Sequence, residues 1–137
     1  MIDPVAVQAS IISMLKAAPA VTAIVGEEIR EDNWMGTKFV YPAVRVAVNP
    51  IAPMANNNGN CRYNIGDVSF TVSCYAEGSS SKGAANLAGQ VADVFNAKLV
   101  PNFKTVVGAS LTQINMPVPE GERLWRADVQ ARTTIKE

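Results

Sequence analysis

The sequence contains no histidine among its 137 residues. Histidine is the commonest general base in enzymes and a frequent metal ligand, so its absence excludes Ser-His-Asp triads and Cys-His pairs. The aspartates and glutamates are dispersed along the chain, and no pair of them is predicted to share an apolar pocket. We therefore expect a protein that is not an enzyme and that binds no cofactor and no metal ion.

Cysteine is nearly as scarce, because the chain has only Cys61 and Cys74. Two isolated cysteines make neither a disulfide framework nor a four-ligand zinc site, which favours a reducing compartment. Cys74 falls on the apolar side of a predicted strand, so we interpret it as a small buried hydrophobic residue. No stretch reaches the roughly 18 apolar residues of a membrane span. The start of the chain also lacks the basic residues of a signal peptide, so we expect no membrane contact.

Net charge is absent as well, since 12 basic residues balance 12 acidic ones. Nucleic-acid-binding proteins usually carry a basic excess on one face, so we expect no specific nucleic-acid binding. The segment 78–83 (GSSSKG) lacks the spacing of a phosphate-binding P-loop. A content of 48% hydrophobic and 18% charged residues is typical of a folded protein, and the length predicts one domain spanning residues 1–137.

What the sequence does contain is a long alternating segment, residues 67–76 (DVSFTVSCYA). Its alternate apolar side chains, from Val68 to Cys74, predict a β-strand with one buried face. Three serines follow, and the period then changes to that of a helix with one apolar stripe between Ala84 and Leu99. The pattern predicts a strand, a turn, and an amphipathic helix over residues 82–99 that folds back onto the strand.

The N-terminal part of the chain predicts two further helices. Asp3 and Pro4 are favoured at a helix start, and Pro19 ends the apolar stripe that follows them. A short second helix is predicted over residues 20–25, because Gly26 is a typical helix stop.

Alternation also predicts three further strands, and these decide the fold class. Between them we expect a flexible connection at 51–60 and a turn at 116–121, neither with a strand or helix signal. Since hairpins dominate this order, we predict an α+β fold: a mostly antiparallel four- to five-stranded sheet with two main helices packed on one face. The further strands are predicted at residues 41–49, 104–114 and 122–135.

Two of these strands predict a polar face opposite the core. In the last strand, Trp125 begins an apolar side, while the opposite side carries Arg126, Asp128, Gln130 and Arg132. In strand 41–49 the valines face the core and the side chain of Arg45 faces out. This alternation is typical of an antiparallel sheet with one side in water.

Three stretches leave their role open. The acidic run 27–32 is either a solvated connector or a docking edge for a basic partner. Trp34, Met35 and Phe39 either tuck under the core or mark an interface, where aromatic residues and methionine are enriched. Between Lys82 and Glu120 the chain has few charged residues, so this region is mostly buried or covered by another subunit. Those charged residues are Asp93, Lys98 and Lys104.

Three stretches together resemble the tail terminator or tail completion proteins of long-tailed bacteriophages. The first is the N-terminal helix followed by residues 18–26 (APAVTAIVG) and then Ile29-Arg30. The second is the segment 41–46 (YPAVRV), which opens a strand. The third is the strand 67–75 with its serine turn and the helix 82–99. The order and spacing of these apolar patterns carry the resemblance, which covers most of the chain.

The resemblance implies a small α+β subunit of a homo-hexameric ring at the head-proximal end of the phage tail tube. Such a ring stops tube polymerisation and presents a surface to the head-side neck or connector protein. It implies a location in the virion, at the tail–neck junction, after synthesis in the bacterial host cytoplasm. The partners it implies are further copies of the chain, the tube protein and the neck protein, with the genome passing through the lumen.

Two groups of residues are our interface hypotheses. The polar sheet face carries ring contacts, lines the lumen or is simply solvated; its members are Arg45, Ser69, Thr71, Arg126, Asp128 and Arg132. Trp34 and Met35, together with Asn56, Asn57 and Asn58 at the tip of the 51–60 connection, are candidates for docking to the tube. The alternatives are a head–tail stopper or other neck connector, and a small non-catalytic ligand-binding module. An enzyme using a carboxylate or Lys82 alone has the least support.

Overall fold

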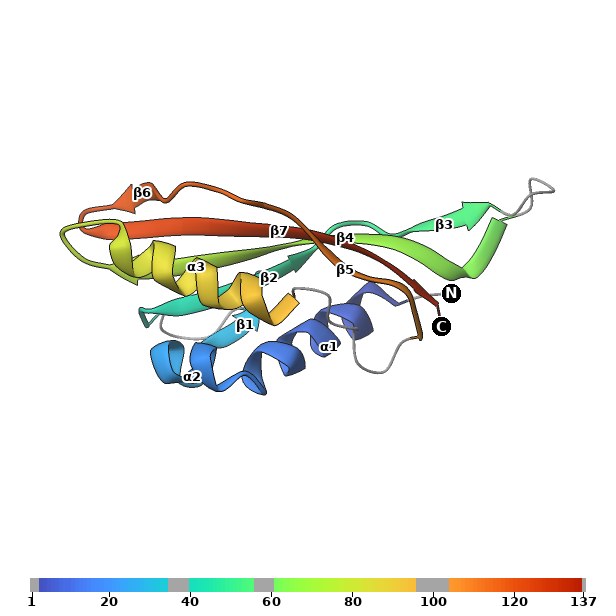
Figure 1. The fold of residues 1–137 in the computed structure, drawn as a ribbon, viewed down its shortest axis with the longest axis horizontal. Helices are drawn as coiled ribbons and strands as arrows, with labels where there is room; N and C mark the ends of the chain where they lie inside the picture. The colour runs from blue at the N-terminus through green and yellow to red at the C-terminus, as the bar shows by residue number, and fades with distance from the viewer. Residues whose placement is uncertain (1–2, 35–39, 56–60, 96–103, 137) are drawn as a thin grey trace.

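The computed structural model describes residues 3–34, 40–55, 61–95 and 104–136. It shows an α+β structure in which helices cover one face of a sheet (Figure 1). In chain order the elements are α1 (Pro4–Lys16), α2 (Pro19–Val25), β1 (Ile29–Glu31), β2 (Ala43–Val48), β3 (Ala52–Ala55), β4 (Cys61–Glu77), α3 (Lys82–Phe95), β5 (Lys104–Ile114), β6 (Val118–Gly121) and β7 (Leu124–Lys136).

The first two helices begin and end where local chemistry favours it. The Asp3 carboxylate accepts a hydrogen bond from the Val5 backbone N–H at 3.0 Å, and Pro4 occupies the first turn of α1. Gly26 ends α2 with a φ of 62°, a conformation that glycine adopts without steric cost. The predicted start of the first helix and the glycine stop of the second are confirmed. The predicted end of the third helix, Leu99, lies outside the described residues.

The sheet within the described residues has seven strands, in the order β1-β2-β4-β7-β5. The two remaining strands, β3 and β6, pair with β4 and β7 respectively. All pairings are antiparallel except the parallel pairing of β1 with β2. The predicted α+β class and the mostly antiparallel sheet are confirmed, whereas the predicted number of four to five strands is too low.

The missed strands are the short ones, which pair through tertiary contacts. β1 lies in the acidic run that we interpreted as either a connector or a docking edge, and its Ile29 is buried. β6 lies in the predicted turn, and all four of its residues are exposed. Strands of three or four residues are too short to show an alternating pattern. Such segments become strands because they pair with the backbone of another strand.

The core lies between the sheet and the helical layer. The apolar alternation predicted for β4 and β7 is confirmed, because Val68, Phe70, Val72 and Cys74 are buried together with Ala127, Val129 and Ala131. Phe70 of β4 meets Phe95 of α3 with ring centroids 5.1 Å apart and ring planes at 67°. Such an edge-to-face pair contributes about 0.5–1.5 kcal/mol beyond its apolar burial. These contacts fix α3 against the central strands.

One hairpin extends beyond the helical layer. β3 and residues 61–66 of β4, which we call the hairpin arm, project past the N-terminal end of α1 in Figure 1. Their register runs from Ala52 opposite Asp67 to Ala55 opposite Cys61, with an irregularity between Pro53 and Met54. The prediction that residues 51–60 contain no strand is therefore wrong for β3. Asn56, Asn57 and Asn58 lie outside the described residues.

Candidate functional site

The face of the sheet that points away from the helices carries the candidate interface residues. The ladder pairs Ser69 with Arg132, Thr71 with Gln130, Ser73 with Asp128, and Tyr75 with Arg126. Arg45 of β2 lies opposite Ser73, so it joins the row that also contains Asp128. The polar face is thus a continuous surface over β2, β4 and β7. We use "polar face" below for Arg45, Asp67, Ser69, Thr71, Ser73, Tyr75, Arg126, Asp128, Gln130 and Arg132.

Arg132 forms an ion pair with Asp67 on the neighbouring strand. Its Nε lies 3.0 Å from each carboxylate oxygen of Asp67, and its Nη2 also contacts that carboxylate. The hydrogen bond from Arg132 lowers the pKa of Asp67, and the same bond raises the pKa of Arg132. The pair is a diagonal cross-strand contact on an exposed surface, so it adds little to stability.

Arg126 is held by acidic residues on two strands. Its Nη1 lies 2.8 Å from Oε1 of Glu120 on β6, and its Nε lies 3.5 Å from Oδ1 of Asp128 on β7. Burial raises the pKa of the neighbouring Tyr75 hydroxyl, and the charge of Arg126 opposes that shift. The arginine charge is therefore balanced within the subunit.

Arg45 departs from the sequence-based prediction, because only 3% of it is exposed although it lies on the polar face. Its Nη1 donates a hydrogen bond to the Val44 carbonyl at 3.0 Å, and its Nη2 lies 3.6 Å from Oε2 of Glu28. Burial lowers the pKa of Arg45, and the charge of Glu28 opposes this shift. The prediction that Arg45 faces solvent is wrong, since strand alternation assigns a face but not what covers it.

Trp34 lies beside this buried charge. The guanidinium carbon of Arg30 lies 4.3 Å from the centroid of the Trp34 ring, and that of Arg45 lies 5.7 Å from it. Trp34 is half-buried, so part of its ring packs against its own subunit, which is one of the two alternatives that the sequence left open. The structure brings together Trp34 and Arg45, which the sequence placed in two different groups. Met35 lies outside the described residues.

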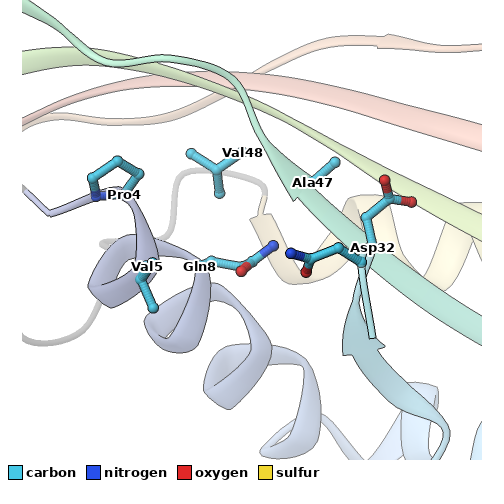
Figure 2. A pocket seen from close by; sticks show the side chains of 7 residues that line it. Pro4, Val5, Gln8, Asp32, Ala47 and Val48 are labelled. Carbon is cyan, nitrogen blue, oxygen red and sulfur yellow. The ribbon is translucent and has the colours of Figure 1, made fainter. Parts of the chain in front are cut away.

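Two hollows lie on the helical side of the sheet. A pocket of about 270 Å³ lies between the start of α1 and the ends of β1 and β2, and Figure 2 shows the side chains that line it. Beside it, the Gln8 amide donates to the Val46 carbonyl at 2.8 Å. A second hollow of about 660 Å³ lies between α1–α2 and α3, and its walls are mainly apolar. In the described part of the chain, no group of three or more acidic or cysteine residues is placed to hold a metal ion.

Cys74 is a free, buried thiol on the core side of β4. Burial raises the pKa of the Cys74 thiol to about 12, which keeps it protonated and unreactive. Among the described helices no single one is long and apolar enough to cross a membrane, although α1 and α2 together, bent by 88°, reach that length and composition.

An exposed apolar group was missed by the sequence analysis. Ile114, Met116 and Val118, which lie where β5 leads into β6, are 48%, 82% and 43% exposed. Ile114 pairs with the core-facing Val129, whereas Val118 pairs with Arg126 of the polar face, so the three side chains do not form one patch. The only signal for them in the sequence was the scarcity of charged residues between Lys82 and Glu120. That scarcity predicted that the region is either buried in its own subunit or covered by another one.

Comparison with known proteins gives the same family as the resemblance. The family model of the tail completion protein gp17 matches residues 9–136. A solved structure of a native gene transfer agent virion particle contains a chain with a TM-score of 0.71 at 17% identity, covering 95% of this chain and 94% of the other. A second solved structure aligns with a TM-score of 0.57 at 15% identity, covering 95% and 96%.

At these identities the two structures establish a shared fold. No match to a curated protein was found. The family match extends over almost the whole chain, and a phage-like virion contains the same fold. The chain therefore belongs to the family of the tail completion protein gp17, and it is a structural protein of the phage virion tail.

Proposed function

We propose that this protein forms a hexameric ring at the head-proximal end of the tail tube, where it stops tube polymerisation and provides the surface for head attachment. The family match over residues 9–136 carries the proposal. The mechanism is geometric: one face of the ring copies the docking surface of a tube ring, and the other face does not. Because no step requires bond making or breaking, the protein acts without catalysis.

The polar face suits a water-filled lumen better than a subunit contact. Arg126 and Arg132 already pair with acidic residues of their own chain. An interface through these residues would have to break or desolvate existing ion pairs, at a cost that new contacts offset only with excellent geometry. A lumen with balanced charges also lets DNA pass without being held, since phosphate binding requires unpaired cations. We therefore assign the polar face to the lumen.

The hairpin arm supports docking to the tube. The two strands of the arm extend beyond the helical layer (Figure 1), and residues 56–58 lie between these strands in the sequence. A protruding hairpin reaches a neighbouring ring without exposing the core. Trp34 is held by Arg30 and Arg45 near the sheet edge β1, and we propose Trp34 and Met35 as a separate candidate for docking to the tube.

Tube growth in the presence of the purified protein tests the proposal. Added to polymerising tube protein, the chain is expected to stop elongation and to be found at one tube end by electron microscopy. Tubes that grow unchanged, while the protein binds the purified head connector, would favour a neck connector and overturn the terminator function.

Two variants then test the surface assignments in the same assay. Arg126→Gln with Arg132→Gln leaves Glu120, Asp128 and Asp67 without their cations, and we expect capping to persist because the polar face makes no subunit contact. Loss of the ring in a folded protein would make the polar face an interface. Deletion of residues 56–58 is expected to abolish capping while leaving the fold intact, and unchanged capping would exclude the tip as the docking element.

A further inference from the structure

Two turns form the end of the subunit that lies opposite the hairpin arm. The arm lies at the start of β4, and at the other end of this strand Glu77 pairs with Leu124 of β7. Because β4 has 17 residues, its two ends lie roughly 50 Å apart. Figure 1 shows β6 and the start of α3 at the end away from the arm. We call residues 77–82 and 120–124 the turn end.

Two hydrogen bonds join these turns, which are far apart in the sequence. The Gly78 backbone N–H donates to the Arg123 carbonyl at 2.8 Å. The Trp125 indole N–H in turn donates to the Gly78 carbonyl at 3.2 Å. The two turns are therefore held in a fixed relative position before any partner binds. A surface that is fixed in advance loses less conformational entropy when it enters an interface.

Arg123 has a backbone conformation that arginine rarely adopts. It follows Glu122 in the tight turn between β6 and β7, and its φ is 59°. Glycine or asparagine usually occupies such a position, because a Cβ atom there lies close to the following carbonyl oxygen. An arginine at this position costs stability, so the strain points to a role for the side chain.

The Arg123 side chain is also set apart from the other arginines. Arg45, Arg126 and Arg132 each pair with a carboxylate of their own chain, and Arg30 lies over an aromatic ring. Arg123 is exposed, and its side chain forms no ion pair or ring contact with the described residues. A guanidinium in this state can form two parallel hydrogen bonds with a carboxylate of another protein.

The charges of the turn end favour a protein partner over DNA. Glu77 and Glu122 are exposed there, and they balance the charges of the exposed Lys82 and Arg123. Phosphate binding depends on a local excess of cations, which this balance does not provide. A protein surface that carries both signs of charge complements the turn end, and the exposed hydroxyls of Ser79 and Ser80 add hydrogen-bonding groups.

We propose that the turn end docks to the head-side connector, with Arg123 bound to a carboxylate of that protein. This inference rests on the proposed terminator function, in which the hairpin arm docks to the tube. A subunit that meets the tube with one end of β4 presents the other end to the head. The turn end has no projecting hairpin arm, so a further tube ring finds no copy of the docking element there.

Arg123→Gly tests this role separately from folding. Because glycine adopts the left-handed conformation without steric cost, the urea midpoint of the variant should equal or exceed that of the wild type. The variant should also cap tubes normally. Capped tails are then mixed with purified DNA-filled heads of the phage, and joined particles are counted by electron microscopy. We expect half-maximal joining to require at least a tenfold higher concentration of heads.

Two further variants complete the comparison. Lys16→Ala is the matched control, because it removes an exposed cation from the helical layer, and it should join heads as the wild type does. Ser80→Trp places a bulky group on the other turn and leaves Arg123 in place. It should also weaken joining, because the two turns form one surface.

The outcomes separate this contact from the terminator function. Normal joining by capped tails that carry Arg123→Gly would overturn the contact and leave the terminator function standing. Loss of capping by the folded variant would place the turn end against the tube or the next copy, and would also overturn it. Normal joining with weaker binding to linear double-stranded DNA would make Arg123 a DNA contact instead. Wild-type protein that neither caps tubes nor supports joining would overturn the proposed function and this inference together.

Discussion

Replacement of Arg45 is expected to destabilise the fold, although its position in an alternating strand predicts an exposed residue. The side chain is 3% exposed, donates to the Val44 carbonyl and lies 3.6 Å from Glu28. Arg45→Ala removes these interactions together with the packing of the aliphatic stem. Losing one partner of a buried ion pair costs about 3–5 kcal/mol. Because the Glu28 side chain is 21% exposed and regains water, we expect about 2–4 kcal/mol here.

Urea and thermal unfolding of the monomer measure this cost. For a chain of this size, a loss of 2–4 kcal/mol lowers the melting temperature by roughly 8–16 °C. Arg45→Met keeps part of the stem and should be less destabilising than Arg45→Ala. Arg132→Ala is the matched control, since it also removes an arginine from the polar face but from a pair that water surrounds, and its unfolding midpoint should stay close to that of the wild type.

Equal midpoints for Arg45→Ala and Arg132→Ala would refute this reasoning and would mean that Arg45 is solvated. The result also bears on assembly. If Arg45→Ala unfolds the subunit, a defect in ring formation by that variant reports on folding and says nothing about contacts. Experiments on the interface therefore use Arg126 and Arg132, whose replacement is expected to leave the core intact.

Two further predictions concern titratable groups. The pKa of Asp67 is lowered by Arg132, so the pair stabilises the fold above the unfolded pKa of about 3.9 and this stabilisation is lost as the pH falls through the lower folded value. The difference in urea midpoint between wild type and Asp67→Asn should therefore shrink from pH 7 to pH 3; a constant or growing difference would contradict the assignment. Burial raises the pKa of Cys74 to about 12, so in Cys61→Ser the folded protein should react with a thiol reagent at pH 8 only as fast as it unfolds. Rapid labelling would show that the inner face of β4 is open.

The parts of the fold that the sequence predicted are those with local periodicity. The strand around Phe70 and the helix that ends at Phe95 each place apolar residues at regular intervals, and the two meet ring to ring in the structure. The Asp3 cap and the Gly26 stop are likewise chemistry of neighbouring residues. Such features need no knowledge of the partner element, so they can be predicted from one segment at a time.

The parts that the sequence did not predict depend on a distant partner. β1 and β3 are strands because β2 and β4 supply their hydrogen bonds, and neither segment has enough residues to show alternation. Arg45 is buried because Trp34 and Glu28, from outside its own strand, lie against it. Alternation gives the direction of a side chain, whereas coverage is a property of the assembled fold.

The candidate surfaces show the same division. The charged residues of the polar face attracted attention in the sequence, yet the structure pairs Arg126 and Arg132 within the chain. The segment 114–118 resembled core sequence, yet Met116 is 82% exposed. In a protein with no net charge, a face of paired ions gives little attraction between copies, whereas exposed apolar groups gain from leaving water. Exposed apolar side chains such as Met116 are therefore better candidates for self-association than the paired ions of the polar face.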